Sequence, residues 1–211
     1  MNKEITTIAT NAELEAFFAA APSTGDGRLI FGLDATASRE ATWDMAAEIQ
    51  AGMFKATGAS LNIMLVYYRG DECKASPWIA SSRRLADMMR KIKCLAGATQ
   101  IGRVLDKARG EKISALVFVG DAVEEEPEEL YKKARHLRAP VFMFQEGDDE
   151  LAEEVFRKIA KITKGKYAKF EPGAAATLAK LLKAVAAFAV GDTKALDAPD
   201  IKLLTDRGTK K

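Results

Sequence analysis

The sequence contains little cysteine, a single histidine and no long hydrophobic run. Its 211 residues include two cysteines, Cys73 and Cys94, without a CxxC spacing. This excludes a disulfide-rich scaffold and gives no indication of a zinc site. The longest stretch without a charged residue, 56–68, has 13 residues, which is too short to cross a bilayer as a helix. The first ten residues contain an acid and no apolar segment, so we expect no signal peptide and a cytoplasmic protein without membrane contact.

The sequence also lacks an excess of charge of either sign. Lysine and arginine total 32 and aspartate and glutamate total 30, a formal net charge of +2. This balance argues against a dedicated nucleic-acid binder, which usually carries a strong basic excess. Hydrophobic residues make up 48% of the chain, enough for a sizeable core, and the length favours one domain.

Short apolar runs alternate with longer segments of helical periodicity. Near-continuous apolar runs predict buried strands at 28–34, 62–68, 114–119 and 140–144. Runs without polar alternation are typical of parallel strands that are covered on both faces. Apolar residues spaced three and four apart predict helices at 12–20, 40–55, 82–93, 100–108, 127–137, 150–162 and 174–190.

Two further segments complete the predicted sheet. Only three residues separate 62–68 from the strand-like segment 72–75, too few for a parallel crossover, so these two segments should form an antiparallel hairpin. Residues 166–170 read as a final edge strand. The sequence therefore predicts an α/β fold, a doubly wound and mostly parallel sheet with helices on both faces.

The two ends of the chain differ from its middle. We expect residues 1–27 to form an N-terminal helical extension and residues 28–190 to form the α/β domain. Residues 191–211 are rich in charge and poor in large apolar side chains. We expect them to be a charged tail that is mobile or loosely docked.

Oxygen-bearing side chains follow two of the predicted strands and precede one helix. Asp34 ends the first strand and Asp121 follows the strand 114–119, while Thr36, Ser38 and Thr99 lie in neighbouring loops. In an open parallel sheet, ligands bind beyond the carboxyl ends of the strands, where the strand order reverses. Two carboxylates with several hydroxyl groups suit a hard divalent cation such as Mg²⁺.

These residues resemble a known family, the von Willebrand factor A (VWA) domain with its metal-ion-dependent adhesion site (MIDAS). Family members carry Asp-x-Ser-x-Ser after the first strand, a threonine in a glycine-rich loop and an aspartate after the fourth strand. The matching residues here are Asp34, Thr36, Ser38, Thr99 in GATQIGRVLDKA, and Asp121. The resemblance covers 28–190 and implies a six-stranded sheet in the order 3-2-1-4-5-6, with the third strand antiparallel.

The resemblance also implies a function. Ser38 and Thr99 would hold Mg²⁺ directly, with Asp34, Thr36 and Asp121 bound directly or through water; Mn²⁺ and Ca²⁺ are alternative ions. The open coordination position would accept an Asp or Glu carboxylate of a partner protein. Intracellular bacterial-type members often work in larger assemblies, frequently with AAA+ ATPases. We therefore expect a binding module and not an enzyme.

This sequence departs from the family pattern at two places. Thr36 replaces the commoner serine, which keeps the hydroxyl group. Gly120 and Ala122 flank Asp121 where many members have threonine and glycine. Neither flanking position is a metal ligand in the family.

Two alternatives remain open at this point. Thr36 or Ser38 could simply cap a helix, accepting its first free backbone N–H groups. The chain could instead be a Mg²⁺-dependent phosphotransferase or hydrolase with Asp34 as nucleophile. Haloacid-dehalogenase-like enzymes, however, need a second acid where Thr36 stands, and no phosphate-binding glycine loop occurs.

Three further residues are candidates for the partner-binding rim of the site. They are Trp78, Gln100 and Glu124. Glu124 begins an acidic run around Pro127, whose main expected role is to stabilise the N-terminus of the helix that starts there. Its position directly after Asp121 is what suggests a second role at the binding face.

Overall fold

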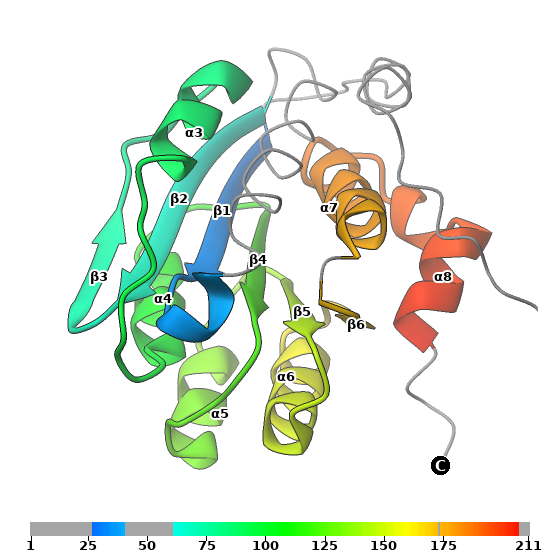
Figure 1. Ribbon diagram of the computed structural model, residues 1–211. Coiled ribbons are helices and arrows are strands. Elements are labelled where there is room, and N and C mark those ends of the chain that lie inside the picture. The colour runs from blue at the N-terminus through cyan, green and yellow to red at the C-terminus, as the bar shows by residue number, and fades with distance from the viewer. Residues whose placement is uncertain (1–26, 41–60, 173, 207–211) are drawn as a thin grey trace, which may run out of the picture.

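The computed structural model describes residues 27–40, 61–172 and 174–206, and these build a single six-stranded sheet (Figure 1). The strand order is β3-β2-β1-β4-β5-β6. All neighbouring strands are parallel except β2 and β3, which are antiparallel. The strands are β1 (Gly27–Asp34), β2 (Leu61–Arg69), β3 (Glu72–Ala75), β4 (Ala115–Gly120), β5 (Val141–Glu146) and β6 (Tyr167–Phe170). The predicted fold class, strand order and hairpin are confirmed.

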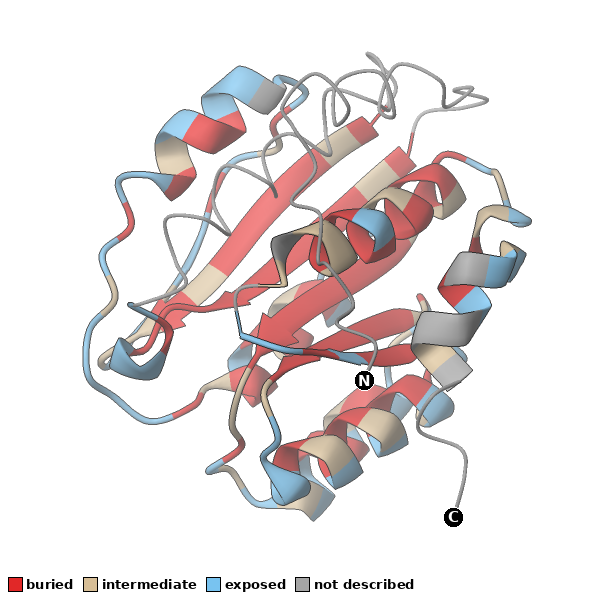
Figure 2. Ribbon diagram, turned by 45° about the vertical axis from the view of Figure 1, so that its right-hand side comes forward, coloured by how far each residue is buried: buried red, intermediate tan, exposed pale blue. Residues whose placement is uncertain are grey.

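Helices cover both faces of the sheet, as Figures 1 and 2 show. Because side chains alternate across a strand, β1 sends Leu29 and Phe31 to one face and Ile30 to the other. The first face packs against α3 and α7, and the second packs against α4, α5 and α6. The central strands are therefore buried on both sides, which explains their unbroken apolar runs.

The helices lie close to their predicted positions. They are α3 (Ser82–Met89), α4 (Ile101–Arg109), α5 (Pro127–Arg135), α6 (Glu150–Ile162), α7 (Ala175–Ala189) and α8 (Pro199–Asp206). The predicted helix at 82–93 was too long, because after Met89 the chain closes tight turns and Ile92 folds back into the core. The predicted helices at 12–20 and 40–55 lie outside the described residues. Of the helices in the described ranges, none is long and apolar enough to span a membrane.

Part of the segment predicted as a charged tail packs onto the domain. A short 3-10 helix, η3 (Ala195–Asp197), and α8 follow α7. Leu196 and Ile201 from these elements are buried in the core cluster beneath α7. The expectation of a mobile or loosely docked tail did not identify this helix, because two buried apolar side chains dock it although charge dominates the composition.

Candidate metal centre

The carboxyl ends of β1 and β4 meet at the point where the strand order reverses. β1 lies between β2 and β4 and is parallel to both, with Asp34 opposite Tyr68 and Leu33 opposite Val119. Asp121 follows the last residue of β4. The sheet thus brings the loops that follow Asp34 and Gly120 to one edge, as expected for a ligand site in a doubly wound sheet.

Asp34 is fully buried and held by two hydrogen bonds. Its Oδ1 accepts the backbone N–H of Thr36 at 2.8 Å, and its Oδ2 accepts the hydroxyl of Tyr68 at 2.8 Å. Burial raises the pKa of this carboxyl, and the negative charge of Asp121 adds to the rise, while the bonds from Thr36 and Tyr68 oppose it. The carboxylate is therefore fixed in direction and disfavoured as a free charge.

The two hydroxyls after Asp34 lie side by side. The oxygens of Thr36 and Ser38 are 3.1 Å apart, and they flank the start of a short 3-10 helix, η1 (Ala37–Arg39). Thr36 is the N-cap residue of η1, yet its side chain makes no capping hydrogen bond. Within the described residues, Thr36 is thus not used as a helix cap, and its hydroxyl faces that of exposed Ser38.

Thr99 is tied to the loop that follows β4. Its hydroxyl oxygen accepts the backbone N–H of Glu124 at 2.9 Å, and the Glu124 carboxylate accepts the backbone N–H of Thr99 at 2.9 Å. The segment leading to Thr99 also runs beside the Asp34 loop, since the N–H of Leu95 donates to the carbonyl of Ala35 at 3.1 Å. All three predicted motif elements thus belong to adjoining loops at one edge of the sheet.

Glu125 also connects the loop after β4 to the segment at the start of α4. Its carboxylate accepts the first free N–H groups of α4, those of Ile101 and Gly102. Burial raises the pKa of Glu125, and these backbone bonds work in the opposite direction. The acidic run was predicted to serve the helix that starts at Pro127, but Glu124 and Glu125 bind the segment at the start of α4 instead.

Asp121 provides the test of whether a cation fits. Its Oδ1 is buried and accepts no hydrogen bond from the part of the chain that the structure describes. An unsatisfied buried carboxylate oxygen is costly, and a cation or a cation-bound water beside Asp34 would satisfy it. No three Asp, Glu, His or Cys side chains of the described ranges gather as a metal cluster, so a cation here would need hydroxyl oxygens or water as further ligands. Such an oxygen donor set fits Mg²⁺.

The structure separates the three predicted rim residues. Gln100 and Glu124 lie at this edge, Gln100 donating from Nε2 to the carbonyl of Gly70 at 2.7 Å. Trp78 does not, because antiparallel β3 returns the chain to the amino end of the sheet. There the Arg28 guanidinium lies 4.1 Å from the centroid of the Trp78 ring. Placing Trp78 at the rim was wrong.

Several solved structures share this architecture, although the sequence matches no family model and no curated protein. A von Willebrand factor type A protein from Catenulispora acidiphila has a TM-score of 0.66 at 17% identity, over 79% of this chain and 43% of that one. The SpRpn10 VWA domain has a TM-score of 0.58 at 9% identity, over 72% and 94% of the two chains. The vWF domain of the type V pili tip protein Mfa5 from Porphyromonas gingivalis has a TM-score of 0.55 at 11% identity, over 79% and 95%.

This chain has the VWA fold. It spans less than half of the Catenulispora acidiphila chain. The glycine before Asp121 has a packing reason in this chain: a Cβ on Gly120 would lie 2.7 Å from the Phe118 ring. A larger residue here would therefore require the Phe118 ring to shift.

Two features of the centre were missed at the level of sequence. Tyr68 ends an apolar run and reads as core, and only the β1–β2 register shows that its hydroxyl meets Asp34. Arg39 reads as a surface residue, yet its side chain is 1% exposed and pairs with Glu146 of β5 at 2.7 Å. An arginine directly after an Asp-x-Thr-x-Ser motif is not by itself a signal of burial.

Proposed function

We propose that this chain is a metal-dependent protein-binding module, with Mg²⁺ at the carboxyl edge of β1 and β4. The observation that carries the proposal is the buried, unsatisfied Oδ1 of Asp121. It lies in the loop that adjoins Asp34, which ends the neighbouring strand. Mn²⁺ and Ca²⁺ also accept such oxygen ligands.

In the proposed site, neutral hydroxyl groups and negatively charged carboxylates have different roles. We infer that Ser38 and Thr99 hold the ion through neutral hydroxyl oxygens, with Thr36 and Asp121 bound directly or through water. Asp34 would bind directly or through water, because each of its oxygens accepts one hydrogen bond and keeps a further lone pair. A bound ion supplies positive charge that neutral ligands leave largely uncompensated, which attracts an Asp or Glu carboxylate of a partner protein.

The alternative, hydrolysis or phosphoryl transfer with Asp34 as nucleophile, has less support. The Asp34 side chain is fully buried, and hydrogen bonds from Tyr68 and Thr36 hold it in place. A nucleophile must be within reach of the substrate, which burial of Asp34 disfavours. Binding is therefore the function that this geometry favours.

The proposed metal site also indicates which kind of partner the chain binds. We propose a protein partner, in keeping with similar folds such as the vWF domain of a pilus tip protein, and an AAA+ ATPase assembly is one candidate. Cys73 and Cys94 are not joined to each other by a disulfide, which agrees with the proposed cytoplasmic location.

The test is metal titration followed by partner capture. We expect wild-type protein to bind Mg²⁺ by calorimetry and Ser38→Ala to bind it more weakly. Ser38 is suited to this test because it is exposed and, among the described residues, its hydroxyl forms a hydrogen bond only with Thr36. Ser81→Ala, at the N-cap of α3, is the matched control and should bind normally.

Partner capture from lysate then compares Mg²⁺ with EDTA. A partner retained by wild type and by Ser81→Ala, only with Mg²⁺ and not by Ser38→Ala, supports the proposal. Failure of the wild-type protein to bind Mg²⁺, Mn²⁺ or Ca²⁺ would overturn it.

A further inference from the structure

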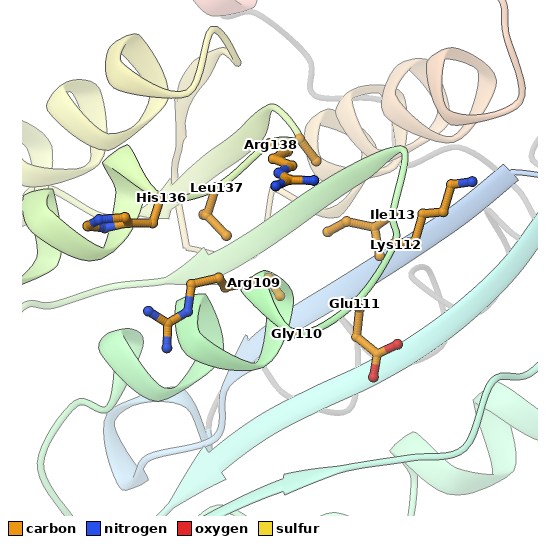
Figure 3. Close-up of a pocket in the computed structure, with 10 residues that line it drawn as sticks. Arg109, Gly110, Glu111, Lys112, Ile113, His136, Leu137 and Arg138 are labelled. Carbon is orange, nitrogen blue, oxygen red and sulfur yellow. The ribbon is translucent and has the colours of Figure 1, made fainter.

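A hollow of about 700 Å³ opens at the amino edge of the sheet, at the opposite end from the candidate metal centre (Figure 3). The turns that join α4 to β4 and α5 to β5 form its walls. Ile113 and Leu137, both half-buried, lie in its middle in this view. The volume is within the range of about 300–1,000 Å³ that is common for small-molecule sites.

The charged residues around this hollow are mostly basic. Arg109, Lys112 and Arg138 line it, and Glu111 is the only acid among the described residues that line it. The Glu111 carboxylate already pairs with Lys107 at 2.6 Å, which lies outside the lining. We call this site the basic hollow.

The helix macrodipole explains only one of the three basic residues that line the hollow. Cations stabilise the last turn of a helix through its macrodipole, and this accounts for Arg109 of α4. Lys112 and Arg138 lie beyond the helices, in the connecting turns. Neither forms a salt bridge with a carboxylate of the described ranges of the chain. Their charges are thus not paired with a carboxylate there.

The C-terminal ends of α4 and α5 border the hollow and bring partial negative charge to it, about half a charge for each helix. Hydrogen bonds inside the helices do not remove this partial charge, because it arises from the aligned peptide dipoles. Three cationic side chains and one carboxylate line the hollow, which leaves two net positive charges. These exceed the partial negative charge of the two helix ends, so the hollow keeps a positive field.

We propose that the basic hollow binds a small phosphorylated organic molecule. Guanidinium and ammonium groups bind phosphate by charge-assisted hydrogen bonds, and arginine does so with two donors at once. Ile113 and Leu137 provide an apolar surface for the organic part, and the volume exceeds what a bare phosphate ion fills. This site is separate from the metal centre and does not depend on the function proposed for it.

Titration of the full chain with AMP and phenyl phosphate tests this proposal, with inorganic phosphate and adenosine as reference ligands. Binding is followed by calorimetry and by the amide NMR shifts of Gly110, Ile113 and Leu137. We expect both organic phosphates to bind, to shift these amides, and to bind more tightly than inorganic phosphate or adenosine.

The Lys112→Gln/Arg138→Gln double variant removes two of the positive charges that line the basic hollow. Both side chains are exposed, so the fold should persist, and AMP affinity should fall by at least about tenfold, as expected for losing charge-assisted hydrogen bonds. The control, Arg135→Gln/Lys161→Gln, removes the same charge from the neighbouring ends of α5 and α6 and should change affinity by less than about twofold.

Three results would overturn the proposal. One is the absence of AMP and phenyl phosphate binding, and another is inorganic phosphate binding as tightly as both. The third is an equal loss of affinity in the two double variants, which would indicate only a diffuse positive surface.

Discussion

The hydroxyl of Tyr68 on β2 donates to Oδ2 of Asp34 on β1 at 2.8 Å, and both side chains are fully buried. This contact fixes the carboxylate that begins the proposed metal-binding motif. Asp34 and Tyr68 are register partners, so the strand pairing itself places the donor. In metal sites, partners of this kind orient the groups that hold the ion.

Tyr68→Phe should therefore weaken Mg²⁺ binding. Loss of an outer hydrogen bond of this type typically costs about 10- to 100-fold in metal affinity. Calorimetric titration measures the change, with urea unfolding of the metal-free protein as a parallel measurement of stability.

Tyr167→Phe is the matched control. It removes a comparable buried hydrogen bond, from the Tyr167 hydroxyl to Gln145 at 2.6 Å, on the neighbouring strands β6 and β5. It should lower stability without changing Mg²⁺ affinity. Equal losses of affinity in both variants would mean that Tyr68 acts only through the packing of the sheet.

The raised pKa of Asp34 predicts how stability depends on pH. Burial is the main cause of the rise above 3.8. As the pH increases, the unfolded state releases this proton first. The free energy of unfolding therefore falls as the pH rises from about 3.8 to the pKa that Asp34 has in the folded state. Above the folded pKa the full penalty remains.

Asp34→Asn removes this penalty. The stability of the variant relative to wild type, without metal, should improve between about pH 3.5 and pH 7. Urea unfolding at both pH values gives the comparison, in which the similar contribution of Glu125 cancels. A relative stability that stays constant or declines over this range contradicts the prediction.

Glu125 should stabilise the start of α4. Glu125→Ala removes the acceptor for the N–H groups of Ile101 and Gly102 and should cost about 1–3 kcal/mol in the free energy of unfolding. Glu126→Ala is the control, because Glu126 is exposed and its side chain makes no capping bond. Equal urea midpoints for the two variants would show that the Glu125 contacts contribute nothing.

The sequence predicts the fold well because most of its signals are local. Buried parallel strands require unbroken apolar runs, and the short gap before Glu72 allows only a hairpin. The positions of Asp34 and Asp121 at strand ends were readable for the same reason. Trp78 was misplaced because the direction of β3 was not carried through to the residues after it.

The hydrogen-bond partners within the centre were less accessible from sequence. Glu124 and Glu125 precede α5, and their contacts with α4 depend on how two loops pack across 25 and 24 residues of chain. Tyr68 likewise gains its role from strand register. Apolar pattern predicts which residues are buried, but it does not predict the direction of a polar group.

The buried pair of Arg39 and Glu146 should be the most sensitive link between the loop of the proposed metal site and the sheet. It joins η1 to β5 at 2.7 Å, with the two side chains 1% and 7% exposed. Glu146→Leu leaves the guanidinium buried with its principal anion removed, which typically costs about 3–5 kcal/mol. Because buried pairs are often replaceable by apolar residues of similar volume, Arg39→Met/Glu146→Leu should recover most of that loss. Urea unfolding of wild type, single and double variant measures both effects. A double variant as unstable as the single one would show that Arg39 contributes through contacts other than this pair.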